Sequence, residues 1–186
     1  MHEARRASEP RGDEPRGSRL WTIGHSTRSL DEFLALLRAN DITRVVDVRR
    51  FPGSRKYPHF NSQELGAALE AAGIGYTHMP ALGGRRTPRP DSPHIEWRNA
   101  AFRGYADYMD TPEFAAAASE LAQLAGRERV AIMCSEAVWW RCHRSMIADW
   151  FAAHGWTVMH ITSTAAPKPH PLRAIGRATK NSKEYT

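Results

Sequence analysis

Residues Val130 to Gly155 read VAIMCSEAVWWRCHRSMIADWFAAHG and indicate the fold class most clearly. The first five residues form a short apolar run followed by polar residues, which is typical of a buried strand. A helix is predicted from about Arg141, because apolar residues then recur at helical spacing until Gly155 ends the pattern. A buried strand that leads into an amphipathic helix indicates the repeating unit of an α/β sheet.

The same alternation continues along the rest of the chain. Four further apolar runs have the length and composition of strands: Leu20–Ile23, Arg44–Val48, Gly75–Met79 and Thr157–Ile161. Helix starts are indicated by a capping box at Ser29 to Glu32, by Asn61 ahead of Glu64, and by Thr111-Pro112. The pattern predicts an α/β fold, a three-layer Rossmann-like domain with a mostly parallel sheet of about five strands and helices on both faces.

A chain of 186 residues fits one domain, which we expect to span residues 20–163. Residues 1–19 are predicted to be a disordered tail, and residues 164–186 a basic, loosely ordered tail. No apolar run approaches the roughly 20 residues that span a bilayer, so no membrane association is expected. Two cysteines and no hydrophobic leader predict reduced thiols and a cytoplasmic location. The sequence does not indicate an oligomeric state.

The net charge of +6 is concentrated near the C-terminus. Residues 164–186 hold five Lys or Arg against one Glu, whereas residues 20–163 hold sixteen basic and fifteen acidic side chains. The high isoelectric point therefore mainly describes the tail. Nucleic-acid binding through this tail and a basic rim is kept as an alternative function.

The loops that follow the strands are where a site is expected, because ligands of such sheets bind beyond the carboxyl ends of the strands. Nine basic side chains fall in these loops: Arg49, Arg50, Arg55, Lys56, Arg85, Arg86, Arg89, Arg141 and Arg144. One positive edge favours an anionic small molecule or nucleotide as the ligand. The predicted substrate-binding residues are His25, Ser26, Asp47, Arg49, Ser54, Arg55 and Arg144.

The loop after the fourth strand holds the predicted catalytic residues. Cys134 ends the strand, and Cys142-His143 is expected in the first turn of the following helix. A cysteine at a helix N-terminus beside basic groups has a lowered pKa, so either thiol is a candidate nucleophile or redox thiol. His143 is a candidate general base or positive partner, and Glu136 a candidate acid/base or a group that orients an arginine.

Simpler structural roles compete with each of these assignments. Cys134 has the position of a small buried residue at the end of a core strand. Glu136 has Arg141 and Arg144 as ion-pair partners nearby in the sequence, and Asp47 has Arg49. The functional interpretation depends on these residues meeting in space, which the alternating topology predicts.

The spacing of the residues in this loop can be compared with the patterns of three known kinds of site. A cysteine phosphatase loop needs an arginine six positions after its nucleophile, where this chain has Trp140. A sulfur-transfer loop is less strict and stays open. A metal could draw on Cys134, Cys142, His143, His25 or Glu136. Because neither pair has the spacing of a zinc knuckle or ribbon, we predict no metal ligands and keep a metal-dependent site as a further alternative. The motifs identify no cofactor.

Six short motifs together resemble the domain-of-unknown-function family numbered 488, whose members are mostly bacterial. They are Thr22-Ile23-Gly24-His25-Ser26, Val46-Asp47-Val48-Arg49, Pro52-Gly53-Ser54-Arg55, Leu82-Gly83-Gly84, Met133-Cys134-Ser135-Glu136 and Cys142-His143-Arg144. The resemblance covers roughly residues 20–163 and implies an α/β fold with a site at these motifs. Ser135 replaces an alanine common in the family, and a proline often found before Cys-His-Arg is absent, which alters the pocket wall. The resemblance implies no particular reaction.

The leading hypothesis is an enzyme, a cysteine-dependent transferase or hydrolase, that acts on an anionic, phosphorylated or nucleotide-like substrate. The alternative is a non-enzymatic module that binds nucleic acid or a phosphorylated partner.

Overall fold

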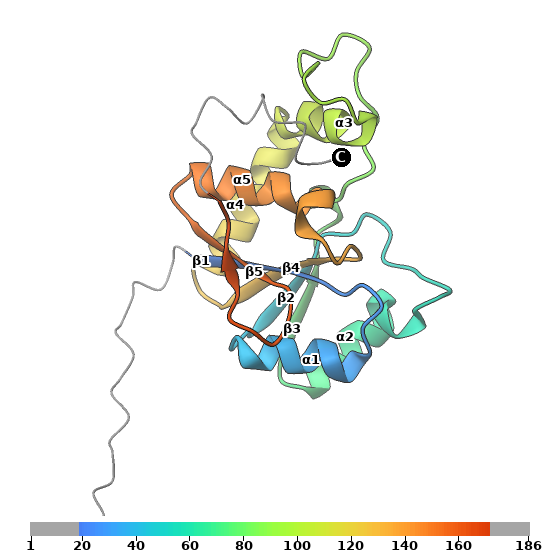
Figure 1. The fold of residues 1–186 in the computed structure, drawn as a ribbon, viewed down its shortest axis with the longest axis vertical. Coiled ribbons are helices and arrows are strands. Elements are labelled where there is room, and N and C mark those ends of the chain that lie inside the picture. The colour runs from blue at the N-terminus through green and yellow to red at the C-terminus, as the bar shows by residue number, and fades with distance from the viewer. Residues whose placement is uncertain (1–18, 172–186) are drawn as a thin grey trace, which may run out of the picture.

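The computed structural model describes residues 19–171, which form an α/β domain around a six-stranded sheet (Figure 1). The strands are β1 (Arg19–Gly24), β2 (Arg44–Asp47), β3 (Gly75–His78), β4 (Val130–Cys134), β5 (Thr157–Ile161) and β6 (Lys168–Pro169). Their order is β3-β2-β4-β1-β5-β6, and every pairing is parallel except that of β5 with β6. The predicted α/β class and mostly parallel sheet are confirmed.

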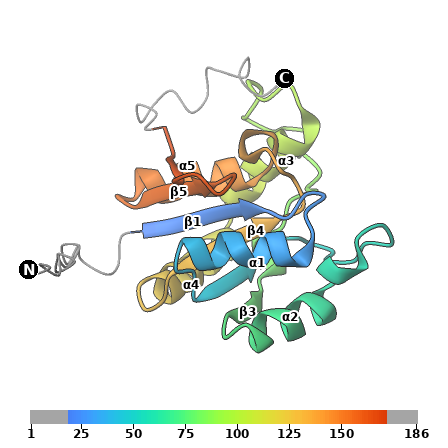
Figure 2. The same cartoon turned by 60° about the horizontal axis from the view of Figure 1, so that its bottom comes forward.

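Helices cover both faces of the sheet (Figures 1 and 2). They are α1 (Leu30–Ala39), α2 (Ser62–Ala71), α3 (Ala100–Met109), α4 (Pro112–Ala125) and α5 (Arg144–Ala153). One buried cluster joins Phe33 and Leu65 of α1 and α2 to the sheet, and a second joins Phe114 and Ile147 of α4 and α5 to its other face. Two apolar cores, one on each face, are the three-layer arrangement that the alternation predicts. Within residues 19–171 no helix is long and apolar enough to cross a membrane.

The helix ends follow the sequence signals at α1 and α4. The Ser29 hydroxyl accepts from the Glu32 amide at 3.2 Å, and the Glu32 carboxylate accepts from the Ser29 amide at 2.7 Å. Thr111 likewise caps α4 by accepting from the Phe114 amide. Asn61 precedes α2 as expected, but its side chain caps no helix amide and instead accepts from the Ser54 amide at 2.6 Å. This bond ties the loop after β2 to the start of α2.

Two helical segments differ from the prediction. The residues from Trp139 to Arg141 form a short 3-10 turn, named η3, so α5 begins at Arg144 and Cys142 lies just before it. Helix α3 was not predicted, although Asn99 caps it by accepting from the amides of Ala101 and Phe102. Both differences place aromatic or reactive side chains at the edge where the strands end.

The sheet continues beyond residue 163, where the domain was expected to end. Lys168–Pro169 forms β6, an antiparallel edge strand beside β5, and so the sheet has six strands. A proline is tolerated in this position because an edge strand leaves amide positions outside the ladder. The remaining parts of the two predicted tails, residues 1–18 and 172–186, lie outside the described residues.

The carboxyl ends of β1, β4 and β2 meet side by side. Gly24 of β1 pairs with Cys134 of β4, and Asp47 of β2 pairs with Met133. The ladder extends into the loops, because the His25 amide donates to the Cys134 carbonyl and the Val48 amide to the Met133 carbonyl. The loops after these three strands therefore begin at the same edge of the sheet, to which β1 and its neighbours point in Figure 2.

Candidate active site

A pocket of about 710 Å³ opens at this edge. Its walls come from the loops after β1, β2, β3 and β4 and from α3. Of the predicted site residues, eight line it: His25, Ser26, Arg49, Ser54, Cys134, Glu136, Cys142 and His143. Asp47 and Arg144 lie buried beneath the lining, and Arg55 does not reach it.

Two buried thiols form part of the pocket lining. The Sγ atoms of Cys134 and Cys142 are 2.7 Å apart, and both cysteines are free. The Glu136 amide also donates to the sulfur of Cys134, at 3.4 Å. Cys134 belongs to the end of a core strand and Cys142 to the turn before α5, so only the fold brings them together.

Arg144 lies directly beneath the thiols and is 1% exposed. Its Nε donates to the sulfur of Cys134 at 3.0 Å, and its other nitrogens donate to the carbonyl of Glu136 and, at 3.4 Å, to the hydroxyl of Thr22. Within residues 19–171 no carboxylate forms an ion pair with it. A buried guanidinium needs a counter-charge, and the thiol pair is the group placed to supply one as a thiolate.

The two thiols respond differently to this environment. Burial would raise the pKa of Cys142, but the hydrogen bond from Cys134 and the positive charge of Arg144 outweigh it and lower the pKa to about 6. Burial and the hydrogen bond shared with Cys142 raise the pKa of Cys134 well above its usual value. The pair thus releases its first proton near neutral pH and retains the second.

His143 is oriented to accept a proton from Cys142. Its Nε2 lies 3.1 Å from the carbonyl of Val48, which can only accept, so Nε2 carries the hydrogen. The free lone pair of Nδ1 then faces the sulfur of Cys142 at 3.5 Å. Burial lowers the pKa of His143, so the neutral ring dominates at pH 7 and the positive partner of the thiols is Arg144.

Asp47 and Arg49 form a second buried unit beside the thiols. Asp47 is fully buried, and its two oxygens accept from Nε and Nη2 of Arg49 at 2.9 and 2.6 Å and from the Tyr76 hydroxyl at 2.8 Å. Arg49 also contacts Nε2 of His25 at 3.3 Å and donates to the Phe60 carbonyl. Asp47 therefore orients a cation in the pocket wall and makes no direct contact with the pocket.

His25 completes this wall. It stacks on Phe60 with ring centroids 4.2 Å apart, and its Nδ1 lies 3.0 Å from the carbonyl of Ser26. Burial lowers the pKa of His25 to about 4, with the charge of Arg49 adding to the effect. A neutral imidazole is therefore held in the wall at pH 7.

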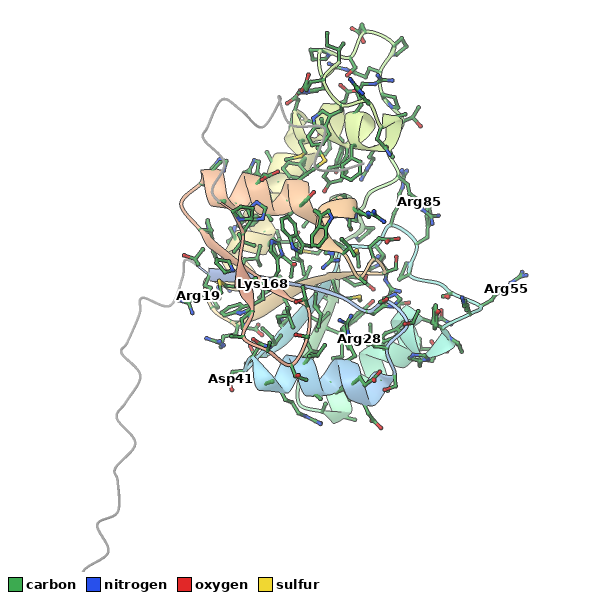
Figure 3. The ribbon with its side chains drawn as sticks, in the orientation of Figure 1. Arg19, Arg28, Asp41, Arg55, Arg85 and Lys168 are labelled. Atoms are coloured by element: carbon green, nitrogen blue, oxygen red, sulfur yellow. The ribbon has the colours of Figure 1, made fainter. Side chains whose placement is uncertain are left out.

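The mouth of the pocket is lined by exposed basic side chains: Arg50, Lys56, Arg85 and Arg141. Glu136 is the acidic residue among the lining residues, and its carboxylate forms no hydrogen bond or ion pair within the described chain. Arg55 instead projects away from the body of the protein at the tip of the loop after β2 (Figure 3). Arg86 and Arg89 are used elsewhere, the first over the ring of Tyr108 and the second beside Asp107.

The sequence interpretation missed two aromatic lining residues, Phe102 and Tyr105, because it missed α3. The Tyr105 hydroxyl donates to the carbonyl of Leu82 at 2.8 Å, and its ring packs 5.2 Å from that of His143. The helical spacing of apolar residues after Asn99 was the available signal. Ser26 and Arg85, which also line the pocket, have positive φ angles of 50° and 58°, a local strain that is common at functional sites.

A chain of hydrogen bonds leads from Arg144 toward the C-terminal part of the described chain. The Thr22 hydroxyl, which accepts from Arg144, lies 2.7 Å from Nδ1 of His160; His160 then bonds His170 at 2.9 Å, and His170 bonds Asp149 at 2.8 Å. Burial lowers the pKa of His160 to about 3, so that ring stays neutral. Each of these hydrogen bonds joins a donor to an acceptor. Because the carboxylate of Asp149 can only accept, it fixes the direction of every hydrogen bond in the series as far as Arg144.

Gly24 is required where β1 meets the loop after β4. A Cβ atom there would lie 1.8 Å from the carbonyl oxygen of Glu136 and 2.9 Å from a nitrogen of Arg144. We expect Gly24→Ala to lower the free energy of unfolding by about 2–3 kcal/mol, the usual cost of overpacking, measured by urea denaturation. Gly53→Ala is the matched control, because nothing lies within 4 Å of a Cβ there. Equal stability of the two variants would contradict the packing described.

The residues on which the alternative metal site could draw do not all gather in one place. Within residues 19–171 no group of three or more His, Cys, Asp or Glu side chains is arranged to hold a metal ion. Cys134, Cys142 and His143 do lie together, but His25 is engaged by Arg49 and Ser26.

Comparison with protein-family models matches residues 29–151 to the family described as Domain of unknown function DUF488. The matched range contains both cysteines, His143, Arg144 and the loop after β2. No curated protein and no solved structure matches the chain.

Proposed function

Because the chain belongs to the DUF488 family, whose description names no function, we propose an activity from the site itself. The protein is a thiol-dependent enzyme that acts on an anionic, phosphorylated or nucleotide-like substrate bound over Cys142. We place it in the cytoplasm, where cysteines are kept reduced.

One observation carries this proposal: a fully buried arginine has thiols where a carboxylate would be expected. Arg144 is 1% exposed and donates to Cys134, which in turn is 2.7 Å from Cys142. A structural arginine in a core is ordinarily paired with an acid, as Arg49 is with Asp47. A cation beside two thiols in a pocket instead favours a reactive thiolate.

The substrate class follows from the charge of the pocket. Five basic side chains line it (Arg49, Arg50, Lys56, Arg85 and Arg141) against the single acid Glu136. Such a lining favours phosphate or carboxylate groups, which arginine binds with paired hydrogen bonds. Phe102, Tyr57 and Tyr105 provide aromatic surface beside these charges for a base or another planar group.

The residues have distinct roles in this proposal. Cys142 attacks the electrophilic atom of the substrate as a thiolate, since its pKa is about 6. His143 takes the proton of Cys142 on Nδ1 and passes it to solvent, so the ring is neutral again beside the thiolate, while Nε2 stays bonded to Val48. The positive charge of the buried Arg144 stabilises the Cys142 thiolate. Glu136, with a carboxylate at the pocket wall, is the candidate acid for the leaving group.

The test is the pH dependence of alkylation by iodoacetamide. We expect the folded protein to react with a midpoint near pH 6, the pKa of Cys142, and Cys142→Ser to lose this fast phase. Cys134→Ala should keep a fast phase whose midpoint is raised, because it loses the hydrogen bond from the Cys134 thiol. The urea-unfolded protein supplies the reference, with a midpoint near the ordinary cysteine value of about 8.5. Identical profiles for folded and unfolded protein would refute a reactive thiol.

A non-enzymatic binding module remains the second candidate, supported by the exposed position of Arg50, Lys56, Arg85 and Arg141. It requires binding of a polyphosphate or oligonucleotide that falls steeply with salt and is unchanged in Cys142→Ser. A truncation that tests the basic tail should begin after residue 171, because β6 and His170 belong to the domain.

A further inference from the structure

We infer that Cys134 and Cys142 form a dithiol–disulfide couple, and that the substrate class of the pocket is a disulfide carrying negative charges. This rests on the proposed function, because it uses the same thiolate and the same basic mouth. It adds a second role for the site: the removal of two electrons from the pair by a disulfide co-substrate, and their return by a thiol reductant.

The position of the two sulfurs carries the first step. They are 2.7 Å apart in the reduced pair, and a disulfide bond is about 2.05 Å long. Bond formation therefore needs a movement of less than about 1 Å. Cys142 lies between η3 and α5, outside regular structure, so its side chain can move while the strand that holds Cys134 stays in place.

The different pKa values of the thiols assign them separate roles. An attacking thiol works best with a pKa near the ambient pH, which is met by Cys142 at about 6. Cys134 has a raised pKa and stays protonated until Cys142 has reacted. Once Cys142 is in a mixed disulfide, Cys134 no longer shares its hydrogen bond with a thiolate, and Arg144 at 3.0 Å favours its ionisation.

The chemical steps balance with these groups. The Cys142 thiolate attacks one sulfur of a substrate R–S–S–R, whose S–S bond breaks and releases one thiolate. Cys134 then attacks the sulfur of Cys142 and gives up its proton; the mixed disulfide breaks, and the second R–S group takes up that proton through solvent and leaves as a thiol. Starting with Cys142 as a thiolate, the protein loses two electrons and one proton, and the substrate gains them to become one thiolate and one thiol. A thiol reductant restores the dithiol by the reverse steps.

The lining of the pocket selects the charge of the substrate. Arg50, Lys56, Arg85 and Arg141 line the same pocket as the thiols, and so does the buried Arg49. A disulfide with carboxylates is attracted by this mouth, whereas one with ammonium groups is repelled.

The experiment uses dithiobis(nitrobenzoate), a disulfide with two carboxylates whose product ion is coloured. We expect the wild-type chain to release two product ions per chain, to retain no adduct by mass spectrometry, and to contain a bond between Cys134 and Cys142 in a non-reducing digest. Cys134→Ser should release one ion and keep one nitrothiobenzoate on Cys142. Cys142→Ser should lose the fast reaction.

Cystamine, a disulfide with two ammonium groups, tests the choice of substrate. We expect it to react at least tenfold more slowly than the anionic reagent, after both rates are divided by those with a free thiol. In the double variant Lys56→Ala, Arg141→Ala, the ratio of the corrected rate with the anionic reagent to that with cystamine should move closer to one.

The outcomes separate this inference from the proposed function. Fast release of a single ion with a retained adduct in the wild type would overturn the couple and leave a reactive Cys142 intact. Closure of the pair with equal relative rates for both reagents would overturn the anionic substrate class. If the alkylation midpoint matched that of unfolded protein, the proposed function would fail as well.

Discussion

Replacing Arg144 with methionine will slow the alkylation of Cys142 at pH 7 by about 30-fold, the fall in thiolate fraction when a thiol pKa rises from about 6 to its ordinary value of about 8.5. Methionine fills much of the space of the arginine and removes the cation beneath the thiol pair. Without that charge, burial dominates and both thiols stay protonated. The measurement is the second-order rate constant with iodoacetamide, taken from pH 5 to pH 10.

Arg144→Lys is the matched control, since it keeps a positive charge but loses the fork that reaches Cys134, Thr22 and the Glu136 carbonyl together. We expect it to retain part of the rate. If the Arg144→Met and Arg144→Lys variants were both alkylated as fast as the wild type, the role of Arg144 would be limited to packing.

The same pair predicts how stability depends on pH. The pKa of Cys142 is about 6 in the folded chain and near its ordinary, higher value when unfolded. The thiolate therefore stabilises the fold fully above the ordinary pKa, and this contribution is lost as the pH falls through 6. The wild type should gain stability between pH 6 and pH 8 relative to Arg144→Met. The variant should still fold, because both thiols can become neutral by binding a proton.

The replacement Asp47→Asn will lower the free energy of unfolding by about 3–5 kcal/mol, the cost of removing one partner from a buried ion pair. Asp47 is fully buried and accepts from Arg49 and Tyr76, so the amide leaves the cation of Arg49 without its counter-charge. Unlike the thiols, a buried guanidinium cannot relieve this by titrating. Urea denaturation at pH 7 measures the loss.

Asp91→Asn is the control for this change, since the side chain of Asp91 is 87% exposed and its contact with Arg89 is long, at 4.0 Å. Its effect should stay within about 0.5 kcal/mol. A similarly small effect of Asp47→Asn would show that Arg49 finds another counter-charge in the pocket.

Some features of the fold follow from local sequence patterns. The apolar runs predict β1, β2, β3, β4 and β5, and capping signals predict the starts of α1 and α4, because these depend on neighbours three or four residues away. The missed elements have weaker local signals. Helix α3 follows a long loop rich in proline and arginine, and β6 has only two residues, one of them a proline. The pairing of β6 with β5 comes from tertiary contacts.

The site divides in the same way. The alternating pattern places Cys134, Cys142, His143, Arg49 and His25 at one edge of the sheet, and the structure brings them together around one pocket. Arg55, by contrast, points away from that pocket (Figure 3), and Asp47 is buried behind Arg49. A residue's place on an edge follows from the order of strands and loops. The direction of its side chain depends on the path of the loop, which is set by bonds such as that from the Ser54 amide to Asn61, seven residues away.

The sequence alone therefore determined the α/β class, the family resemblance and the edge of the sheet where reactive side chains collect. Hydrophobic periodicity and helix capping depend on residues close together in the chain, so both can be recognised from the sequence. Which groups share a hydrogen bond or an ion pair is known only from the three-dimensional arrangement of the chain. The sulfurs of Cys134 and Cys142 meet beside Arg144 because the segment between β4 and α5 folds back on the end of its strand, and burial there makes each group strongly affect the others. Asp47 and Arg49 are two residues apart, and the structure shows that their ion pair is buried.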